Sequence, residues 1–552
     1  MFQKIIKNHW PEILILAAII FFLREVLFLG KIFIPQDIDL GDFVLGTIPE
    51  TTYLAQALHQ GRFPLWAPEF YAGFPFAVNG ESGLYYPINL VLFYLFPQQI
   101  AWGLYALIAF CTLGFSLFYF LKNLNLSKEA ALISTLSFTF ATGIIVRIVH
   151  LPILGTIAFL PLTLLLAQLF FTKRNPLYLL ALSFVLSLQI LNFNPPTTLL
   201  CFLAFSLYFL FLTLTTFTKQ KDFLANFASF AAVLILALSL SAVQLVPMAK
   251  MLSYSSRGGG VSEIEAKEFP FTPQELRYFF QATPFGDPSE GTYQSPSPNN
   301  FVFFWENNAY VGLTAFALGL LSLFLLWKKN KYVFFFGSLF IFSVILALGQ
   351  FTPLFFLLRL PPFSFFRVPG RFLILSMFSL TILAGFAFDL ITRKFPSKRT
   401  MTGVILASII FIDLFSFGLF YNPTYDAKKW LSAPENAKFL QEDPSYFRTY
   451  ILGEKEAFNA LAPGWQKDIK PFFNLKEGLP GMTSLLYGLN QSEGFRLGLV
   501  PQRIVNWESN LQKNFQVDFE KGTAQTSPLA VKMIRLKNVK YVVTHYQINS
   551  LE

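Results

Sequence analysis

The feature that most constrains the fold is a series of long apolar runs, each of roughly 17–25 residues. Within a bilayer every backbone N–H and C=O group needs a partner inside the protein, so only α-helices and closed β-barrels can span it. Barrel strands alternate apolar and polar residues, and these runs do not alternate. The sequence therefore predicts a polytopic α-helical membrane protein with about eleven spans. They are expected at 11–30, 100–121, 129–146, 154–171, 176–192, 197–217, 223–247, 309–327, 332–348, 372–391 and 401–421.

The charge content of the chain supports this class. Only 13% of the 552 residues are charged, whereas soluble proteins contain about 25%. The formal net charge is +10, but the basic residues lie in short segments between the apolar runs, which is the pattern of membrane topology signals. We therefore expect a lipid bilayer, and no nucleic acid, to be the partner of these charges.

The basic segments also predict orientation, because Lys and Arg are enriched in the cytoplasmic loops of membrane proteins. With a cytoplasmic N-terminus, every inner segment is basic, and an odd number of spans places everything after Tyr421 outside. The inner basic residues are Lys4 and Lys7; Lys122 and Lys128; Lys173 and Arg174; Lys219 and Lys221; Lys328, Lys329 and Lys331; and Arg393, Lys394, Lys398 and Arg399.

The domain organisation follows from this topology. Residues 1–421 form the predicted transmembrane module, with long outer loops at 31–99, 248–308 and 349–371. From residue 422 to 552 charges become common and apolar runs become short. The pattern predicts a strand at 538–544 and a helix at 433–440, so we expect a small α+β extracytoplasmic domain at 422–552.

Three carboxylates open the first outer loop, at Asp37, Asp39 and Asp42. A carboxylate at the membrane boundary can act as a general base toward a hydroxyl or as a ligand of a hard divalent cation such as Mg²⁺ or Mn²⁺. Asp39 and Asp42 would share a helix face, whereas Asp37 and Asp39 would share a strand face. Spacing therefore leaves both roles open, together with that of an ordinary solvated acidic loop.

The rest of this loop is rich in Pro, Gly and aromatic residues, including Trp66 and Tyr86, and it contains the further acid Glu81. Such composition beside a membrane predicts short interfacial helices with aromatic anchors at headgroup depth. The segment is interpreted either as a structural cap over the helices or as the wall of a substrate groove. Glu81 is either a second functional carboxylate or an acid on a surface loop.

Several motifs in order along the chain resemble the bacterial YfhO-type membrane proteins, which are placed among the GT-C glycosyltransferases. These are multi-span enzymes that use polyprenyl-phosphate-linked sugars. The motifs are GD at 41–42, GRFPLWAP at 61–68, YPINL at 86–90, HL at 150–151 leading to LPL at 160–162, NFNPP at 192–196, PFG at 284–286, YVGL at 310–313, FRVPGRF at 366–372 and NVKYV at 538–542.

The resemblance implies roles for individual residues. Asp42 aligns with the family's loop acid and is the first choice for the catalytic base, with Asp39 second. Arg367 and Arg371 would bind the donor phosphate, since an i,i+4 pair in a helix places both guanidinium groups on one side. Pro369 and Gly370 between them instead favour a helix start, and lipid headgroups are alternative partners of the two arginines.

His150 follows the third predicted span and is a weaker candidate for contacts with the donor phosphate or a hydroxyl group. A structural role for this histidine is the alternative. The resemblance fixes no cofactor. A divalent cation would bind at Asp37, Asp39 and Asp42, and a metal-free reaction is equally compatible with the sequence.

The family resemblance thus implies an inverting glycosyltransferase in a bacterial cytoplasmic (inner) membrane. It would transfer a hexosyl or pentosyl group from a polyprenyl-phosphate donor to an envelope glycopolymer or lipid on the outer face. Two other functions remain compatible with the sequence. One is a transporter or flippase of a polyprenyl-linked substrate, and the other is a non-catalytic envelope scaffold.

Overall fold

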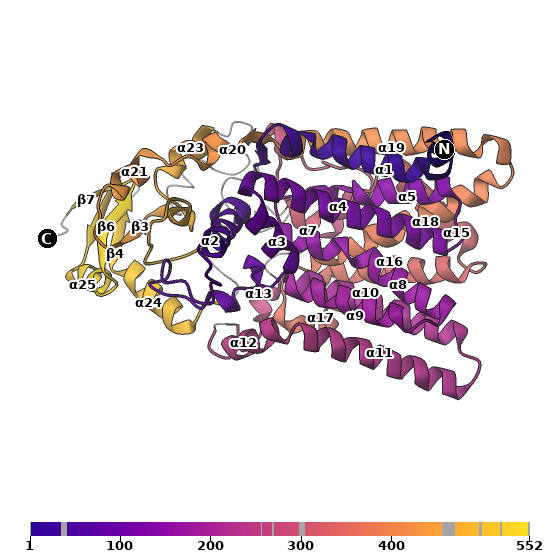
Figure 1. Cartoon of the computed structure of the whole chain (residues 1–552), viewed down its shortest axis with the longest axis horizontal. Helices are drawn as coiled ribbons and strands as arrows, with labels where there is room; N and C mark the ends of the chain where they lie inside the picture. The colour runs from indigo at the N-terminus through magenta and orange to yellow at the C-terminus, as the bar shows by residue number, and fades with distance from the viewer. Residues whose placement is uncertain are drawn as a thin grey trace.

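The computed structural model describes residues 2–34, 41–255, 257–267, 270–296, 304–454, 470–495, 499–518 and 521–549. The molecule is elongated, with a bundle of long helices at one end and the C-terminal region at the other (Figure 1). Helices α2 (Ile48–His59) and α3 (Pro87–Leu95), which belong to the first outer loop, lie between these two ends.

The bundle consists of the apolar helices that the hydropathy pattern predicts. Local signals define several of their ends: the side chains of Ser127, Asn194 and Asn330 accept hydrogen bonds from the first turns of α5, α10 and α16. The helices are α1 (Phe2–Phe28), α4 (Gln98–Asn123), α5 (Lys128–Thr139), α6 (Thr142–Ile145), α7 (Leu151–Ala158), α8 (Leu160–Lys173), α9 (Leu177–Leu191), α10 (Pro195–Thr216), α11 (Gln220–Leu240), α12 (Ala242–Leu252), α15 (Leu313–Leu326), α16 (Lys331–Ala347), α18 (Leu373–Thr392) and α19 (Arg399–Tyr421).

Six helical stretches are long and apolar enough to cross a membrane, judged by length and composition over the described residues. Four shorter apolar helices, namely α9, α12, α15 and α16, accompany them. These helices confirm a multi-pass membrane protein. The six stretches are Gln98–Asn123, Leu151–Lys173, Pro195–Thr216, Gln220–Leu240, Pro369–Thr392 and Pro396–Tyr421. The count of about eleven crossings stays a prediction.

The predicted continuous span at 129–146 is wrong, because the helix breaks after Thr139. Ala141 is extended, and the short helix α6 follows it. The backbone N–H of Thr142 donates to the Tyr310 carbonyl oxygen at 2.9 Å, and the Ser137 hydroxyl donates to the Val311 carbonyl oxygen at 2.6 Å. A break in a helix of the bundle is tolerated because neighbouring protein groups supply the hydrogen-bond partners that its backbone needs.

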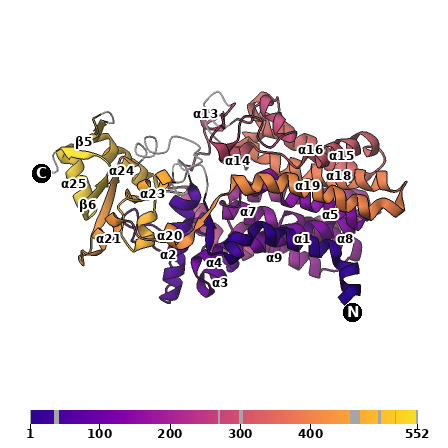
Figure 2. The ribbon, with the colours of Figure 1, turned by 90° about the horizontal axis from the view of Figure 1, so that it is seen from above.

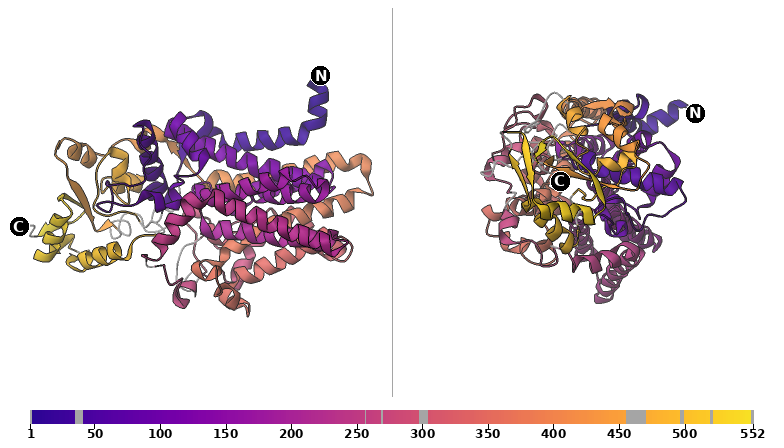
Figure 3. Two further views of the ribbon diagram at one scale, coloured as in Figure 1. Left: turned by 60° about the horizontal axis from the view of Figure 1, so that its bottom comes forward. Right: turned by 90° about the vertical axis from the view of Figure 1, so that its left-hand side faces the viewer.

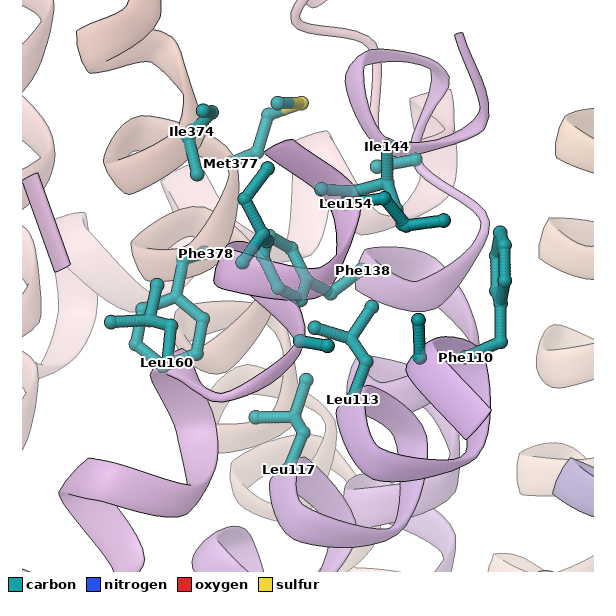
Figure 4. Packing of buried hydrophobic residues seen from close by; sticks show 14 of the residues in the cluster. Phe110, Leu113, Leu117, Phe138, Ile144, Leu154, Leu160, Ile374, Met377 and Phe378 are labelled. Carbon is teal, nitrogen blue, oxygen red and sulfur yellow. The ribbon is translucent and has the colours of Figure 1, made fainter. Parts of the chain in front are cut away.

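Helix α18 lies at the centre of the bundle and is buried along nearly its whole length. Phe138 of α5 meets Phe378 of α18 edge to face, with ring centroids 5.2 Å apart. Aromatic pairs of this geometry add stabilisation beyond the area that they bury. Figure 4 shows the side chains around this pair, contributed by α4, α5, α6, α7, α8 and α18: Phe110, Leu113, Leu117, Ile144, Leu154, Leu160, Ile374 and Met377.

Helix α1 bends near its start, where His9 leaves helical geometry two residues before Pro11. Proline lacks the N–H that a helix interior requires, and its ring crowds the preceding turn. The segment before the bend consequently points away from the bundle (Figure 3).

The C-terminal region contains both helices and strands, as the sequence pattern predicts. Strand β3 (Arg448–Leu452) pairs in parallel with β6 (Val539–Thr544), and a second sheet has the order β4-β5-β7. The predicted strand at 538–544 corresponds to β6, and the predicted helix at 433–440 overlaps α21. The other elements are α20 (Ala427–Leu431), α21 (Glu435–Gln441), α23 (Lys470–Lys476), α24 (Gln502–Lys513), α25 (Pro528–Leu536), β4 (Phe515–Asp518), β5 (Thr523–Thr526) and β7 (Gln547–Asn549).

The C-terminal region is fastened to the first outer loop. Strand β1 (Lys31–Phe33) pairs antiparallel with β2 (Thr424–Asp426), which follows the last bundle helix. Farther along, the backbone N–H of Met482 donates to the Leu45 carbonyl oxygen at 2.9 Å, and the N–H of Tyr71 donates to the Glu493 carbonyl oxygen at 3.2 Å. The loop and the C-terminal region therefore lie on the same side of the helix bundle, with the loop between the two (Figure 2).

Candidate active site

A buried ion-pair network lies at the end of the bundle that faces the first outer loop. Glu306, in the short helix α14 (Phe304–Asn307), accepts hydrogen bonds from both Arg147 and Arg371. The Arg147 Nη2 atom lies 2.5 Å from Glu306 Oε2, and the Arg371 Nη2 atom lies 2.7 Å from Glu306 Oε1. The side chains of Arg147 and Glu306 are only 2% and 4% exposed, whereas Arg371 is 18% exposed. Arg371 thus extends from this network toward solvent.

Glu306 remains ionised in this setting. Burial alone would favour its protonated form, but the two guanidinium groups beside it together hold the pKa of Glu306 well below its usual range. The carboxylate can therefore orient both arginines through charge-assisted hydrogen bonds at any physiological pH.

Close backbone packing brings Arg371 to Glu306. Arg371 lies in the 3₁₀ turn η8 (Pro369–Phe372), which packs against α14. A Cβ atom at Gly370 would lie well inside van der Waals contact of Asn307 Oδ1 and 3.2 Å from the Glu306 carbonyl oxygen. The absence of a side chain at position 370 therefore lets the two segments approach this closely.

Arg367 and Arg371 do not share a helix face, so that part of the prediction is wrong. Val368 between them has a left-handed conformation, with φ of 69°, and the helical turn begins only at Pro369. Arg367 is exposed, and its charge acts on Glu265. The two arginines therefore do not form one bidentate clamp in this structure.

Asp42 and Glu81 lie close enough to Arg371 for the three charges to influence one another. Asp42 directly precedes the π-helical turn η1 (Phe43–Thr47), and Glu81 lies in the 3₁₀ turn η3 (Gly80–Ser82). Both residues remain exposed to solvent although protein atoms surround them on most sides. In the described part of the chain no hydrogen bond holds either carboxylate, so both are available to a ligand.

The surroundings of Asp42 raise its pKa toward neutral pH. Burial among protein atoms, followed by the negative charge of Glu81, raises the pKa of Asp42 to about 7, although Arg371 acts in the opposite direction. Burial likewise raises the pKa of Glu81, against the charges of Arg371 and Arg257. A carboxylate with a pKa near the ambient pH is suited to general-base catalysis.

A third carboxylate, Glu50 in the first turn of α2, escaped the sequence analysis. It is buried and accepts a hydrogen bond from Asn79 Nδ2 at 2.9 Å. Burial raises the pKa of Glu50 to about 8 despite this hydrogen bond, with smaller contributions from Glu81 and Asp42. An acid in a first helical turn is common, because it interacts favourably with the helix dipole. The sequence therefore gave no sign that Glu50 is buried near Asp42 and Glu81.

His150 directly precedes α7 and lies at the border of the same network. Its ring lies 6.0 Å from the ring of Trp305, and its Nδ1 atom is buried without a hydrogen-bond partner in the described structure. Burial, then the positive charge of Arg147, lowers the pKa of His150 to about 3. The imidazole is therefore neutral, which suits a contact with a hydroxyl group better than charge-based binding of phosphate.

The remaining predicted groove residues lie in different surroundings. Tyr86 is only 2% exposed and packs edge to face against Tyr105, so it belongs to the packed interior and does not line an open groove. Trp66 is exposed, and its ring covers Gly73, whose φ of 118° requires glycine. A role of Trp66 in substrate binding stays a prediction.

The predicted metal ligands are only partly described. Asp37 and Asp39 lie outside the described residues. Within the ranges that are described, no group of three or more His, Cys, Asp or Glu side chains could hold a metal ion.

The fold and this cluster define a multi-pass membrane protein with acidic and basic side chains gathered at one end of its helices. Among solved structures, the chain is similar to the arabinofuranosyltransferase AftD from mycobacteria, with a TM-score of 0.60 at 14% sequence identity. The match covers 97% of this chain and 35% of the AftD chain, so this chain spans about a third of that protein. The likeness supports the GT-C-like fold.

The chain matches no family model and no curated protein. The resemblance to YfhO-type proteins therefore stays a prediction.

Proposed function

We propose that this chain is a GT-C-type glycosyltransferase that uses a polyprenyl-phosphate sugar as donor and Asp42 as catalytic base. One observation carries the proposal: an exposed carboxylate with a pKa near 7 lies beside an arginine that a buried glutamate orients. The GT-C-like fold, shared with a membrane arabinofuranosyltransferase, supports the same class of reaction.

In the proposed reaction a carboxylate oxygen of Asp42 takes the proton of an acceptor hydroxyl group. The acceptor oxygen attacks the anomeric carbon from the side opposite to the leaving group, and the configuration at this carbon is inverted. The bond between the anomeric carbon and the phosphate oxygen breaks, and its electron pair leaves with the polyprenyl phosphate. The proton remains on Asp42 until solvent removes it.

The leaving phosphate needs positive charge. Arg371 is the best candidate, because Glu306 holds one edge of its guanidinium group and its positive charge acts on Asp42 and Glu81. Arg257, whose charge also acts on Glu81, is a second source. Glu50 would be mostly protonated at neutral pH, which limits the negative charge that the donor phosphate meets.

A lipid-linked donor fits the location of this cluster. Its polyprenyl chain would stay in the bilayer beside the helices while the sugar phosphate reaches the polar residues at their end. With the predicted topology this end is extracytoplasmic, and the acceptor is an envelope glycopolymer or lipid. The transferred group is a hexosyl or a pentosyl group.

The test is the Asp42→Asn variant of the purified full-length protein, reconstituted with polyprenyl-phosphate glucose or polyprenyl-phosphate arabinofuranose. Release of polyprenyl phosphate that depends on an acceptor is the measured quantity. General-base catalysis contributes about 10²–10⁴-fold, so we expect a loss of at least about 100-fold. Glu442→Gln, which changes an exposed acid directly after α21 and outside this cluster, is the control and should keep full activity. Unchanged turnover in Asp42→Asn would exclude Asp42 as the base.

A further inference from the structure

A groove of about 1030 Å³ opens at the end of the bundle opposite to the C-terminal region. It runs between the C-terminal half of α10 and the turn that joins α15 to α16. This volume is at the upper end of the range for ligand sites. The groove lies far from the candidate active site, so it calls for a separate explanation.

The floor and walls of the groove are apolar. Phe211 of α10 packs against Phe335 of α16, with ring centroids 4.7 Å apart, and against Tyr332 at 5.9 Å. Leu210, Leu214 and Phe334 line the groove and are exposed. Because α10 and α16 are apolar helices of a membrane-spanning bundle, this surface faces hydrocarbon, and an acyl chain is its natural occupant.

The mouth of the groove is basic. Lys328, Lys329 and Lys331 line it and are exposed. Among the residues that line the groove there is no carboxylate, and in the described chain none of the three lysines is joined to an acid in an ion pair. An apolar trough that ends in three such cations matches a molecule with an apolar chain and an anionic head.

We propose that this groove is a binding site for an anionic phospholipid. Its acyl chain would lie along α10 and α16, and its phosphate would contact the lysines of the turn. Clustered Lys residues beside membrane helices attract anionic headgroups with about 1 kcal/mol per residue, or about a fivefold change in binding constant. With the predicted topology the bound lipid belongs to the cytoplasmic leaflet, where anionic lipids are abundant. This site does not depend on the proposed transferase activity.

Native mass spectrometry of the full-length protein in detergent tests the proposal by titration with phosphatidylglycerol and with phosphatidylcholine of identical acyl chains. We expect phosphatidylglycerol to bind at least tenfold more tightly. In Lys328→Gln/Lys331→Gln this preference should fall at least about tenfold, since two headgroup contacts are lost. Both lysines are exposed, so folding is retained.

Lys219→Gln/Lys221→Gln is the matched control. Lys219 lies in the turn before α11, and Lys221 lies in the first turn of α11. Both are exposed, but neither lines the groove. The control should bind phosphatidylglycerol as the wild type does. Equal binding of the two lipids by the wild type would overturn the proposal. So would an equal loss in both double variants, which would indicate general attraction to a basic surface.

Discussion

Neutralising Glu306 is expected to destabilise the protein strongly, because this carboxylate compensates two arginines at once. In Glu306→Gln the shape is kept, but Arg147, only 2% exposed, loses the partner that lies 2.5 Å away. Breaking a buried pair while leaving the other charge in place costs about 3–5 kcal/mol. Arg371 adds less because it is partly exposed. We therefore expect the free energy of unfolding to fall by about 3–5 kcal/mol.

The chain contains a suitable reporter for this experiment. Cys201 is buried in α10 and Cys111 is half-buried in α4, so a thiol-reactive fluorophore will label Cys201 only when the bundle opens. Labelling rates over a denaturant series give the free energy of unfolding for each variant. Glu435→Gln, which removes an exposed partner of Lys438, is the control and should cause no measurable change.

A compensating variant separates charge from packing. Glu306→Gln/Arg147→Met removes the uncompensated buried cation and replaces it by an apolar chain of similar length, so part of the lost stability should return. The reasoning would be refuted if Glu306→Gln were as stable as the wild type. It would also be refuted if adding Arg147→Met to Glu306→Gln lowered the free energy of unfolding further, by as much as a disruptive substitution in the core does.

Three further predictions concern the same cluster. If Asp42 is the catalytic base, as proposed, it must be deprotonated to act, so transferase activity should rise with pH through about 7, the pKa of Asp42; a rate that is flat from pH 6 to pH 8 contradicts this role. Glu50 has a pKa of about 8 when folded against a usual value of 4.5, so its contribution to stability is complete below pH 4.5 and is lost as the pH rises to 8. Glu50→Gln should lack this loss in unfolding measurements. Gly370→Ala should destabilise the protein by about 1–3 kcal/mol through overpacking against Asn307, measured by the same labelling assay, and a neutral effect would show that η8 can shift.

The sequence predicted the helices correctly where a continuous apolar run is enough to define a helix. Runs such as 100–121 and 372–391 correspond to α4 and α18 with shifts of a few residues. The break after Thr139 was not readable, because the extended backbone is stabilised by Tyr310, which lies far away along the chain. A hydrogen bond of this kind leaves no trace in local composition.

The candidate site was readable only in part. Asp42 and Arg371 were singled out from motifs and Glu81 as a further acid of the first outer loop. Their charges influence one another in the structure, although their chemical roles stay predictions. Nothing in the sequence marked Glu306 as a site residue, since it is one acid among several in a long predicted outer loop. Its importance comes from contact with Arg147, which is 159 positions away. Arg367 shows the converse case, because a spacing of four residues has meaning only where the backbone is helical.

The pairing of β1 with β2 has a consequence for biogenesis. Strand β1 leaves the ribosome early, but its partner follows α19, roughly 400 residues later, which is on the order of half a minute at usual synthesis rates. Until the last bundle helix has been inserted, the segment that carries Asp42 lacks this anchor. A nascent or truncated chain that ends before residue 424 would thus lack the strand that pairs with β1, and the segment that carries Asp42 would be without this anchor.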